Sequence, residues 1–258
     1  MRKARYRLAM TLLFSAGATP ALAVQPVQFP DPTIEATAPS GFPEPQAGFQ
    51  GAQPAVEAPP EYDSRAAILN VANWVVGTND HGGLPFMVLD KKGAIAFMFD
   101  PEGQLAGETA VLIGSAEGDQ SIPDIGNREL KEIRIEERTT PAGRFVMEMG
   151  PALGKFRRVL WVNFQDSIAL HPVITSNPEE QRTKRLKSES PLDNRITYGC
   201  INVPADFYAK VVRPLFFLTH GIAYILPEHG DIASFIPGYR PDFPASAPRL
   251  VMRSDGGD

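Results

Sequence analysis

The sequence of 258 residues contains one cysteine, Cys200, and only four histidines. One cysteine excludes an intramolecular disulfide and any metal cluster built from several thiolates. The chain also lacks an HExxH motif, a paired-histidine motif, a GxGxxG loop and a P-loop, so we expect neither a metal nor another cofactor. The formal net charge is −5, which argues against sequence-independent binding to nucleic acid.

Long apolar runs are missing as well. The apolar run that starts at Leu8 follows four basic residues and gives way to small residues before Ala21-Leu22-Ala23. A membrane-spanning helix needs about 20 apolar residues, whereas a basic start, a short apolar run and an A-x-A site are typical of a secretory signal peptide. We therefore predict that residues 1–23 are cleaved off after Ala23, and that the exported chain has no stable membrane insertion.

Proline, in contrast, is abundant, and nine of the 25 prolines lie in residues 24–60. This segment contains no basic residue and too little apolar surface to build a core. We interpret residues 24–62 as a disordered linker, which is either a spacer or a tail without a role. Residues 63–230 are predicted to form one folded domain, and residues 231–258 a C-terminal tail that wraps the surface or frays.

The folded domain is predicted to be mainly β. A helical stripe capped by Ser64 precedes a β-hairpin at residues 86–99. Further strands are predicted at residues 105–113, 132–135, 143–149, 159–164, 167–173 and 221–226, a short helix at 204–212, and loops at 114–127 and 178–194. Many short strands with few helices favour a mixed or antiparallel sheet.

Cys200 lies in the segment Ile196-Thr197-Tyr198-Gly199-Cys200-Ile201-Asn202, shortly before a predicted helix. A thiol ahead of a helix lies near oriented N–H groups and a partial positive charge, which stabilise the nucleophilic thiolate. The N–H groups of Gly199 and Cys200 are candidates for an oxyanion site, and Asn202 either orders the turn or binds substrate. From the residues alone, a buried structural thiol remains the alternative interpretation.

A thiolate nucleophile usually requires a base, and His171 is the favoured one of the four histidines. It ends a predicted strand, and Pro172 after it favours an extended conformation at the end of the sheet. A structural or solvated role remains the alternative for His171, and it is the favoured interpretation for His81, His220 and His229.

These residues resemble the active-site signature of the L,D-transpeptidases of the YkuD type. The run from Thr197 to Asn202 is similar to the hydroxyl residue, Gly-Cys and aliphatic residue of that signature, and Leu170-His171-Pro172 is similar to its upstream histidine. Thr140-Pro141-Ala142-Gly143-Arg144-Phe145 resembles the family's Thr-Pro-x-Gly-x-Phe segment, and the hairpin at 88–99 resembles the opening of its domain. The features occur in the family's order over residues 84–226.

The resemblance implies an L,D-transpeptidase-like β-sandwich with mixed sheets and a few short helices. Cys200 would attack a peptidoglycan stem peptide and release D-alanine, and an amine of another stem would resolve the thioester into a cross-link. His171 would be base and then acid, oriented by the carbonyl of Pro172, with Gly199 and Tyr198 at the oxyanion site. The resemblance further implies a periplasmic role in cell wall biogenesis and cell shape, and acylation by carbapenems.

The sequence departs from the family pattern in three places. His171 and Cys200 are 29 positions apart, more than is usual, and the loop at 178–194 accounts for the excess and is a candidate lid. Tyr198 stands where many members have histidine, and Asn202 where many have arginine. Thr197 and Asn202 are candidate substrate-binding residues, and Arg195 is either a replacement cation for substrate or a surface residue.

Three alternatives remain open. The same thioester could pass to water, which would make the protein an L,D-carboxypeptidase or a hydrolase of a wall linkage. The protein could be a non-catalytic relative that binds wall peptides, although retention of both Cys200 and His171 argues against this. It could also be an unrelated β domain with an incidental cysteine, which the ordered motifs disfavour. The sequence does not indicate an oligomeric state.

Overall fold

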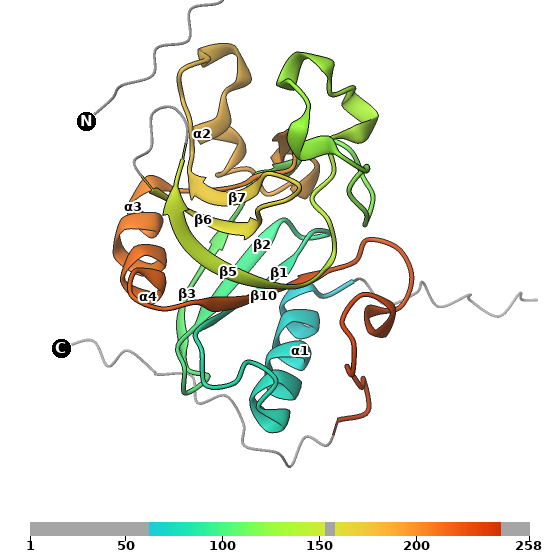
Figure 1. Ribbon diagram of the computed structural model, residues 1–258, viewed down its shortest axis with the longest axis vertical. Coiled ribbons are helices and arrows are strands. Elements are labelled where there is room, and N and C mark those ends of the chain that lie inside the picture. Colours follow the sequence, from blue (N-terminus) through green and yellow to red (C-terminus); the bar gives the residue numbers. More distant parts are fainter. Residues whose placement is uncertain (1–61, 153–157, 244–258) are drawn as a thin grey trace, which may run out of the picture. The chain divides into compact units, whose positions relative to one another are not determined.

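The computed structural model describes residues 62–152 and 158–243. The predicted signal peptide, all of the predicted linker except residue 62, and the end of the predicted tail lie outside the described residues. Within the described ranges, no helix is both long enough and apolar enough to cross a membrane. The chain is mainly β, with a mixed sheet and a few short helices, as predicted (Figure 1).

Eight strands form one mixed sheet in the order β3-β2-β1-β10-β5-β6-β7-β9. They are β1 (Phe86–Asp90), β2 (Ile95–Phe99), β3 (Leu105–Ala110), β5 (Gly143–Pro151), β6 (Arg158–Asn163), β7 (Ile168–Pro172), β9 (Ile201–Val203) and β10 (Gly221–Leu226). A second, parallel pair consists of β4 (Ile113–Gly114) and β8 (Arg195–Thr197). The long strand β5 joins the two halves of the sheet, because its first part pairs with β10 and its last part with β6.

The half of the sheet made of β1, β2 and β10 is buried on both faces. In β1, Phe86 and Val88 belong to the core under α1 (Ser64–Thr78), whereas Met87 and Leu89 belong to the core between the two halves of the sheet. This second core is closed by the helical segment from α3 (Ala205–Phe207) to α4 (Arg213–Phe216). Successive side chains of a strand point to opposite faces, which explains why these strands read as nearly continuous apolar runs.

The N-cap of helix α1 lies one residue earlier than the sequence indicated. The side chain of Asp63, not Ser64, accepts a hydrogen bond from the Ala66 N–H at 3.0 Å. At the other end of the domain, the described part of the predicted tail is packed. Ile236 is fully buried, and the ring of Tyr239 lies 5.5 Å from that of Trp74 in α1.

The predicted strand at residues 132–135 is wrong, because the segment forms 3₁₀ turns at Leu130–Glu132 and Ile135–Glu137. The Glu137 carboxylate accepts a hydrogen bond from the Arg134 N–H at 2.9 Å and pairs with Arg128 at 3.0 Å. These local contacts satisfy the polar groups of the turn without a partner strand.

Candidate active site

His171 lies in β7, and Cys200 directly precedes β9, the parallel neighbour of β7. His171 in β7 is opposite Asn202 in β9, and Leu170 is opposite Ile201. Residues opposite each other share a face of the sheet, and residues two apart on one strand do so as well. His171 and Asn202 therefore share one face of the sheet, and Cys200 lies two residues before Asn202, directly ahead of β9. Leu170 and Ile201 point into the core.

His171 and Cys200 line the same cleft, whose volume is about 990 Å³. The cleft opens over β6 and β7, and its walls come from the β6–β7 turn and the segment around residues 124–127. Its other lining residues are Asp124, Gly126, Asn127, Pro151, Ala152, Val159, Trp161, Phe164, Gln165, Asp166, Ser167, Ala169 and Ile174. Cys200 is partly exposed whereas His171 is buried, so a ligand in the cleft would meet the sulfur first.

The environment of the Cys200 side chain favours the neutral thiol. Burial raises the pKa of the thiol, and this effect outweighs the opposing influence of the Ala169 backbone and of the positive charge on Arg182. The Sγ atom lies 3.4 Å from the carbonyl oxygen of Ser167, to which the thiol donates. The nucleophile therefore has to lose a proton before it reacts.

His171 is in the state that can receive this proton. Burial lowers the pKa of its imidazole, the nearby charge of Arg182 lowers it further, and the hydrogen bond to the Pro172 carbonyl opposes both. Nδ1 lies 2.8 Å from that carbonyl oxygen, and Nε2 lies 3.2 Å from Nδ2 of Asn202. The cleft is thus lined by an imidazole and a thiol whose neutral forms are both favoured.

The turn that carries Cys200 is held by its own side chains. Thr197 Oγ1 donates to the Cys200 carbonyl oxygen at 2.7 Å and accepts the Gly199 N–H at 3.1 Å. The prediction that the Gly199 N–H serves an oxyanion site is therefore corrected, and the Cys200 N–H is the remaining candidate. Thr197 is buried and holds the turn, which corrects its predicted role in substrate binding. Gly199 has φ +124°, and a Cβ there would lie 2.6 Å from the Thr139 carbonyl oxygen.

The segment that begins at Thr140 contacts the segment that contains Cys200 at this turn. Thr140 Oγ1 donates to the Gly199 carbonyl oxygen at 2.8 Å and accepts the Gly114 N–H at 2.9 Å. The Tyr198 ring packs under the guanidinium of Arg138 at 3.9 Å. Tyr198 is not among the described residues that line the cleft, so its ring fixes the turn from outside the cleft.

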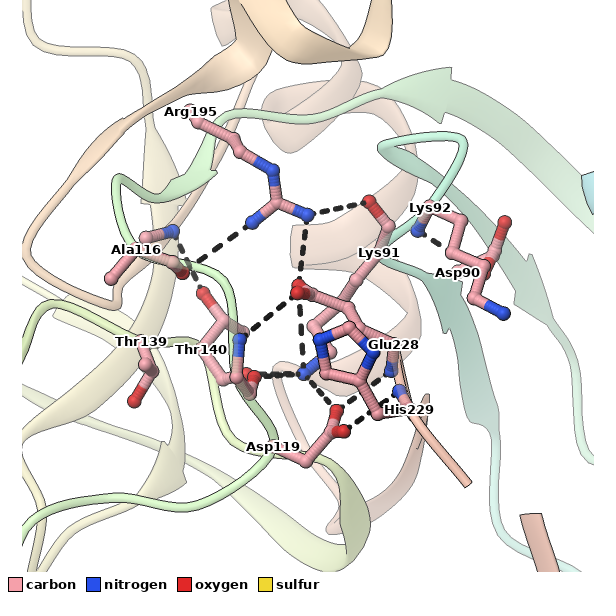
Figure 2. A network of polar contacts seen from close by, with 12 residues as sticks. Asp90, Lys91, Lys92, Ala116, Asp119, Thr139, Thr140, Arg195, Glu228 and His229 are labelled. Atoms are coloured by element: carbon pink, nitrogen blue, oxygen red, sulfur yellow. Dashed lines mark hydrogen bonds and ion pairs between the residues drawn. The ribbon is translucent and has the colours of Figure 1, made fainter. Parts of the chain in front are cut away.

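A buried charge cluster surrounds Lys91 and includes Thr140, which contacts the turn (Figure 2). Lys91 is fully buried, and its Nζ donates to the carbonyl oxygens of Gly118 (2.6 Å) and Thr140 (2.9 Å) and to the Asp119 carboxylate (2.7 Å). Glu228 lies 3.8 Å from the same Nζ. Burial lowers the pKa of Lys91, but the two carboxylates oppose this. The cluster connects the end of β1 to Thr140 and so to the nucleophile turn.

Arg195 belongs to this cluster. Its guanidinium pairs with Glu228 at 2.8 Å and donates more weakly to the carbonyl oxygens of Ala116 and Lys91 (Figure 2). Arg195 is not among the described residues that line the cleft. Its predicted role as a cation for substrate is therefore corrected: it balances a buried carboxylate at the start of the motif.

The cation near the nucleophile is Arg182, which the sequence interpretation did not single out. It begins α2 (Arg182–Arg185), inside the predicted loop at 178–194, and its Nη1 donates to Oδ1 of Asn202 at 2.8 Å. Asn202 itself is fully buried and binds Arg182 and His171, which corrects its predicted contact with substrate. The only signal in the sequence was the extra length between His171 and Cys200.

No protein-family model matches the sequence, and no curated protein matches it. Similar solved structures include the helical cell shape determining protein Pgp2 from Campylobacter jejuni, with 14% identity, coverage of 57% of this chain and 49% of that chain, and a TM-score of 0.35. The Ldtfm–avibactam carbamoyl enzyme has 15% identity, coverage of 56% and 49%, and a TM-score of 0.32.

A third similar structure is a fused Zn-dependent amidase/peptidase/peptidoglycan-binding domain-containing protein from Clostridium acetobutylicum, with 15% identity, coverage of 63% of both chains and a TM-score of 0.32. The chain spans about half the length of Pgp2 and of Ldtfm. Likeness at this level assigns neither a family nor an activity, so the function has to be argued from the site.

The buried cluster predicts a large loss of stability in Lys91→Met. The substitution leaves Asp119 and Glu228 without their buried cation, and removal of one partner of a buried ion pair costs about 3–5 kcal/mol. The free energy of unfolding is measured by denaturant titration. The control is Lys92→Met, because Lys92 is exposed above the Tyr62 ring and its loss should cost less than about 1 kcal/mol. Equal losses in both variants would contradict the prediction.

The protonation states predict how Cys200 reacts with iodoacetamide. Because burial raises the thiol pKa, the alkylation rate should rise steadily from about pH 6 to about pH 9 and have no plateau on the acid side. The same protein unfolded in denaturant is the control, and its thiol should react faster at each pH. A folded thiol that reacts faster than the unfolded one at about pH 6 would instead reveal a thiolate–imidazolium pair.

Proposed function

We propose that the protein is an exported cysteine acyltransferase that acts on peptidoglycan stem peptides, with L,D-transpeptidation as its reaction. The observation that supports the proposal is that Cys200 and His171 line the same cleft. The ordered resemblance of the Thr140 and Cys200 segments to the YkuD-type L,D-transpeptidases supplies the substrate class. The basic and apolar start of the chain supports export to the periplasm.

In the first half of the reaction, Cys200 attacks the amide carbonyl that links the third residue of a tetrapeptide stem to the terminal D-alanine. His171 Nε2 takes the thiol proton as Sγ bonds to the carbonyl carbon. The Cys200 N–H stabilises the oxyanion of the tetrahedral intermediate. Collapse breaks the C–N bond, and His171 returns the proton to the departing amine of D-alanine, which leaves a thioester on Cys200.

In the second half, an amine of another stem attacks the thioester carbonyl. His171 takes a proton from that amine, the C–S bond breaks, and the sulfur recovers a proton from His171. The products are a new amide cross-link and free thiol. The cleft of about 990 Å³ has room for an acyl chain with its acceptor beside it, since ligand sites of this kind measure about 300–1,000 Å³.

The test is incubation of the purified protein with tetrapeptide-stem muropeptides, analysed by mass spectrometry. Release of D-alanine together with the appearance of dimers is the expected result, and Cys200→Ala should reduce both to background. His171→Gln should lower the rate by about 10²–10⁴ because the general base is removed. His220→Gln is the matched control, since His220 is exposed and pairs with Glu148.

Two outcomes would change the assignment. Release of D-alanine without dimers would show that water or another group resolves the thioester. Turnover in Cys200→Ala at the wild-type rate would overturn the nucleophile, and with it the proposed mechanism.

The same nucleophile predicts covalent inhibition by carbapenems. Ring opening of the β-lactam by Cys200 adds the whole mass of the drug to the protein, because the acyl group and the opened ring remain joined. Intact-mass spectrometry should therefore show one adduct per chain in the wild type and none in Cys200→Ala. An unmodified wild-type mass after long incubation would contradict the prediction.

A further inference from the structure

Arg182 reaches the site from the segment inserted between β7 and β8 (Figure 1). Its side chain is only 11% exposed, and its Nε donates to the Glu180 carboxylate. Nη1 donates to Oδ1 of Asn202 at 2.8 Å. Arg185 ties the same short helix to the carbonyl oxygens of Glu180 and Asp193. The contact with Glu180 therefore fixes the guanidinium of Arg182 so that Nη1 faces Asn202.

The donors and acceptors along these contacts allow one arrangement. A guanidinium has only donors, so the Asn202 atom that faces Arg182 is the oxygen. The amide nitrogen of Asn202 then faces Nε2 of His171 at 3.2 Å, and it can only donate. Nε2 must accept and therefore carries no proton. At the other end, the Pro172 carbonyl can only accept, so the proton is on Nδ1.

We propose that Arg182 and Asn202 form a positioning relay that fixes His171 in its Nδ1–H tautomer. The Nε2 lone pair accepts the Asn202 N–H at rest, and this hydrogen bond has to give way when Nε2 takes a proton. The identity of that proton, from Cys200, rests on the proposed function, whereas the tautomer rests on the contacts alone.

The relay also opposes the charged form of the ring. A protonated imidazole has N–H on both nitrogens, and its Nε2–H would face the N–H₂ of Asn202. Asn202 cannot turn over to offer its oxygen, because its nitrogen would then face Arg182. An imidazolium formed during turnover is therefore a strong acid toward the departing amine, which suits the second proton transfer.

The charges around His171 act in the same direction. Arg182 adds a positive charge beside the ring, which its pairing with Glu180 reduces in part. Burial lowers the pKa of His171 first, and Arg182 lowers it further. The other titratable groups that line the cleft are Cys200, Asp124 and Asp166.

The test is NMR of the ring nitrogens in the full chain labelled with ¹⁵N-histidine. In the wild type, His171 should show a protonated Nδ1 and an unprotonated Nε2 over the neutral range. Arg182→Met frees Asn202 to turn its oxygen toward Nε2 and should raise the proton affinity of His171 by about tenfold, or one pKa unit. Asn202→Asp should raise it at least as much, because a carboxylate accepts from Nε2–H while it still pairs with Arg182.

Two controls separate the relay from a general loosening of the segment. Arg182→Lys keeps a cation with donors only and should keep the wild-type tautomer. Arg185→Met loosens α2 without a contact to Asn202 and should leave the pKa of His171 unchanged. A protonated Nε2 in the neutral wild-type ring would overturn the relay, and so would equal pKa shifts in Arg185→Met and Arg182→Met. These measurements use no substrate, so their failure is distinct from a negative result with muropeptides.

Discussion

The register between β7 and β9 is the constraint on which the site depends. The parallel pair places His171 opposite Asn202, and a shift by one residue would put Ile201 or Val203 opposite His171 and move the Asn202 side chain away from the imidazole. The pairing is short, so it needs support from both sides. Leu112 provides it on the far side of β9, because its backbone exchanges hydrogen bonds with Asn202 at 2.8 and 2.9 Å.

The nucleophile turn depends on a second constraint, the buried charge of Lys91. Its Nζ has to be neutralised and hydrogen-bonded inside the protein, which draws Asp119, Glu228 and the Thr140 carbonyl to one point. Thr140 then holds Gly199 through its hydroxyl group. The Thr-Pro segment and the Gly-Cys segment are thus parts of one assembly, although they lie about 60 positions apart in the chain. This gives a physical reason for both segments to occur in one sequence.

The sequence predicted the structural features that follow from the spacing of apolar residues and from turn-forming residues. The hairpin of β1 and β2 and the mainly β fold both rest on alternation and turn residues. The failed strand at 132–135 had the same alternation, since Ile133 and Ile135 flank a charged residue. In that segment the Glu137 carboxylate accepts local hydrogen bonds, and such contacts cannot be inferred from the spacing of apolar residues. For Arg195 the sequence left two roles open, because adjacency to the motif does not show which way a strand residue points. In the structure β8 pairs with β4, outside the main sheet.

Asn202 and the long segment between His171 and Cys200 act together. The segment carries Arg182, and Arg182 donates to Asn202, which faces His171. The guanidinium is thus supplied from a neighbouring helix rather than from the motif strand. The amide of Asn202 accepts from the guanidinium through its oxygen and donates to the imidazole through its nitrogen. A guanidinium in direct contact with the ring could also only donate to Nε2, but it would bring its positive charge next to that atom. The longer loop and the asparagine are therefore best understood as one structural unit.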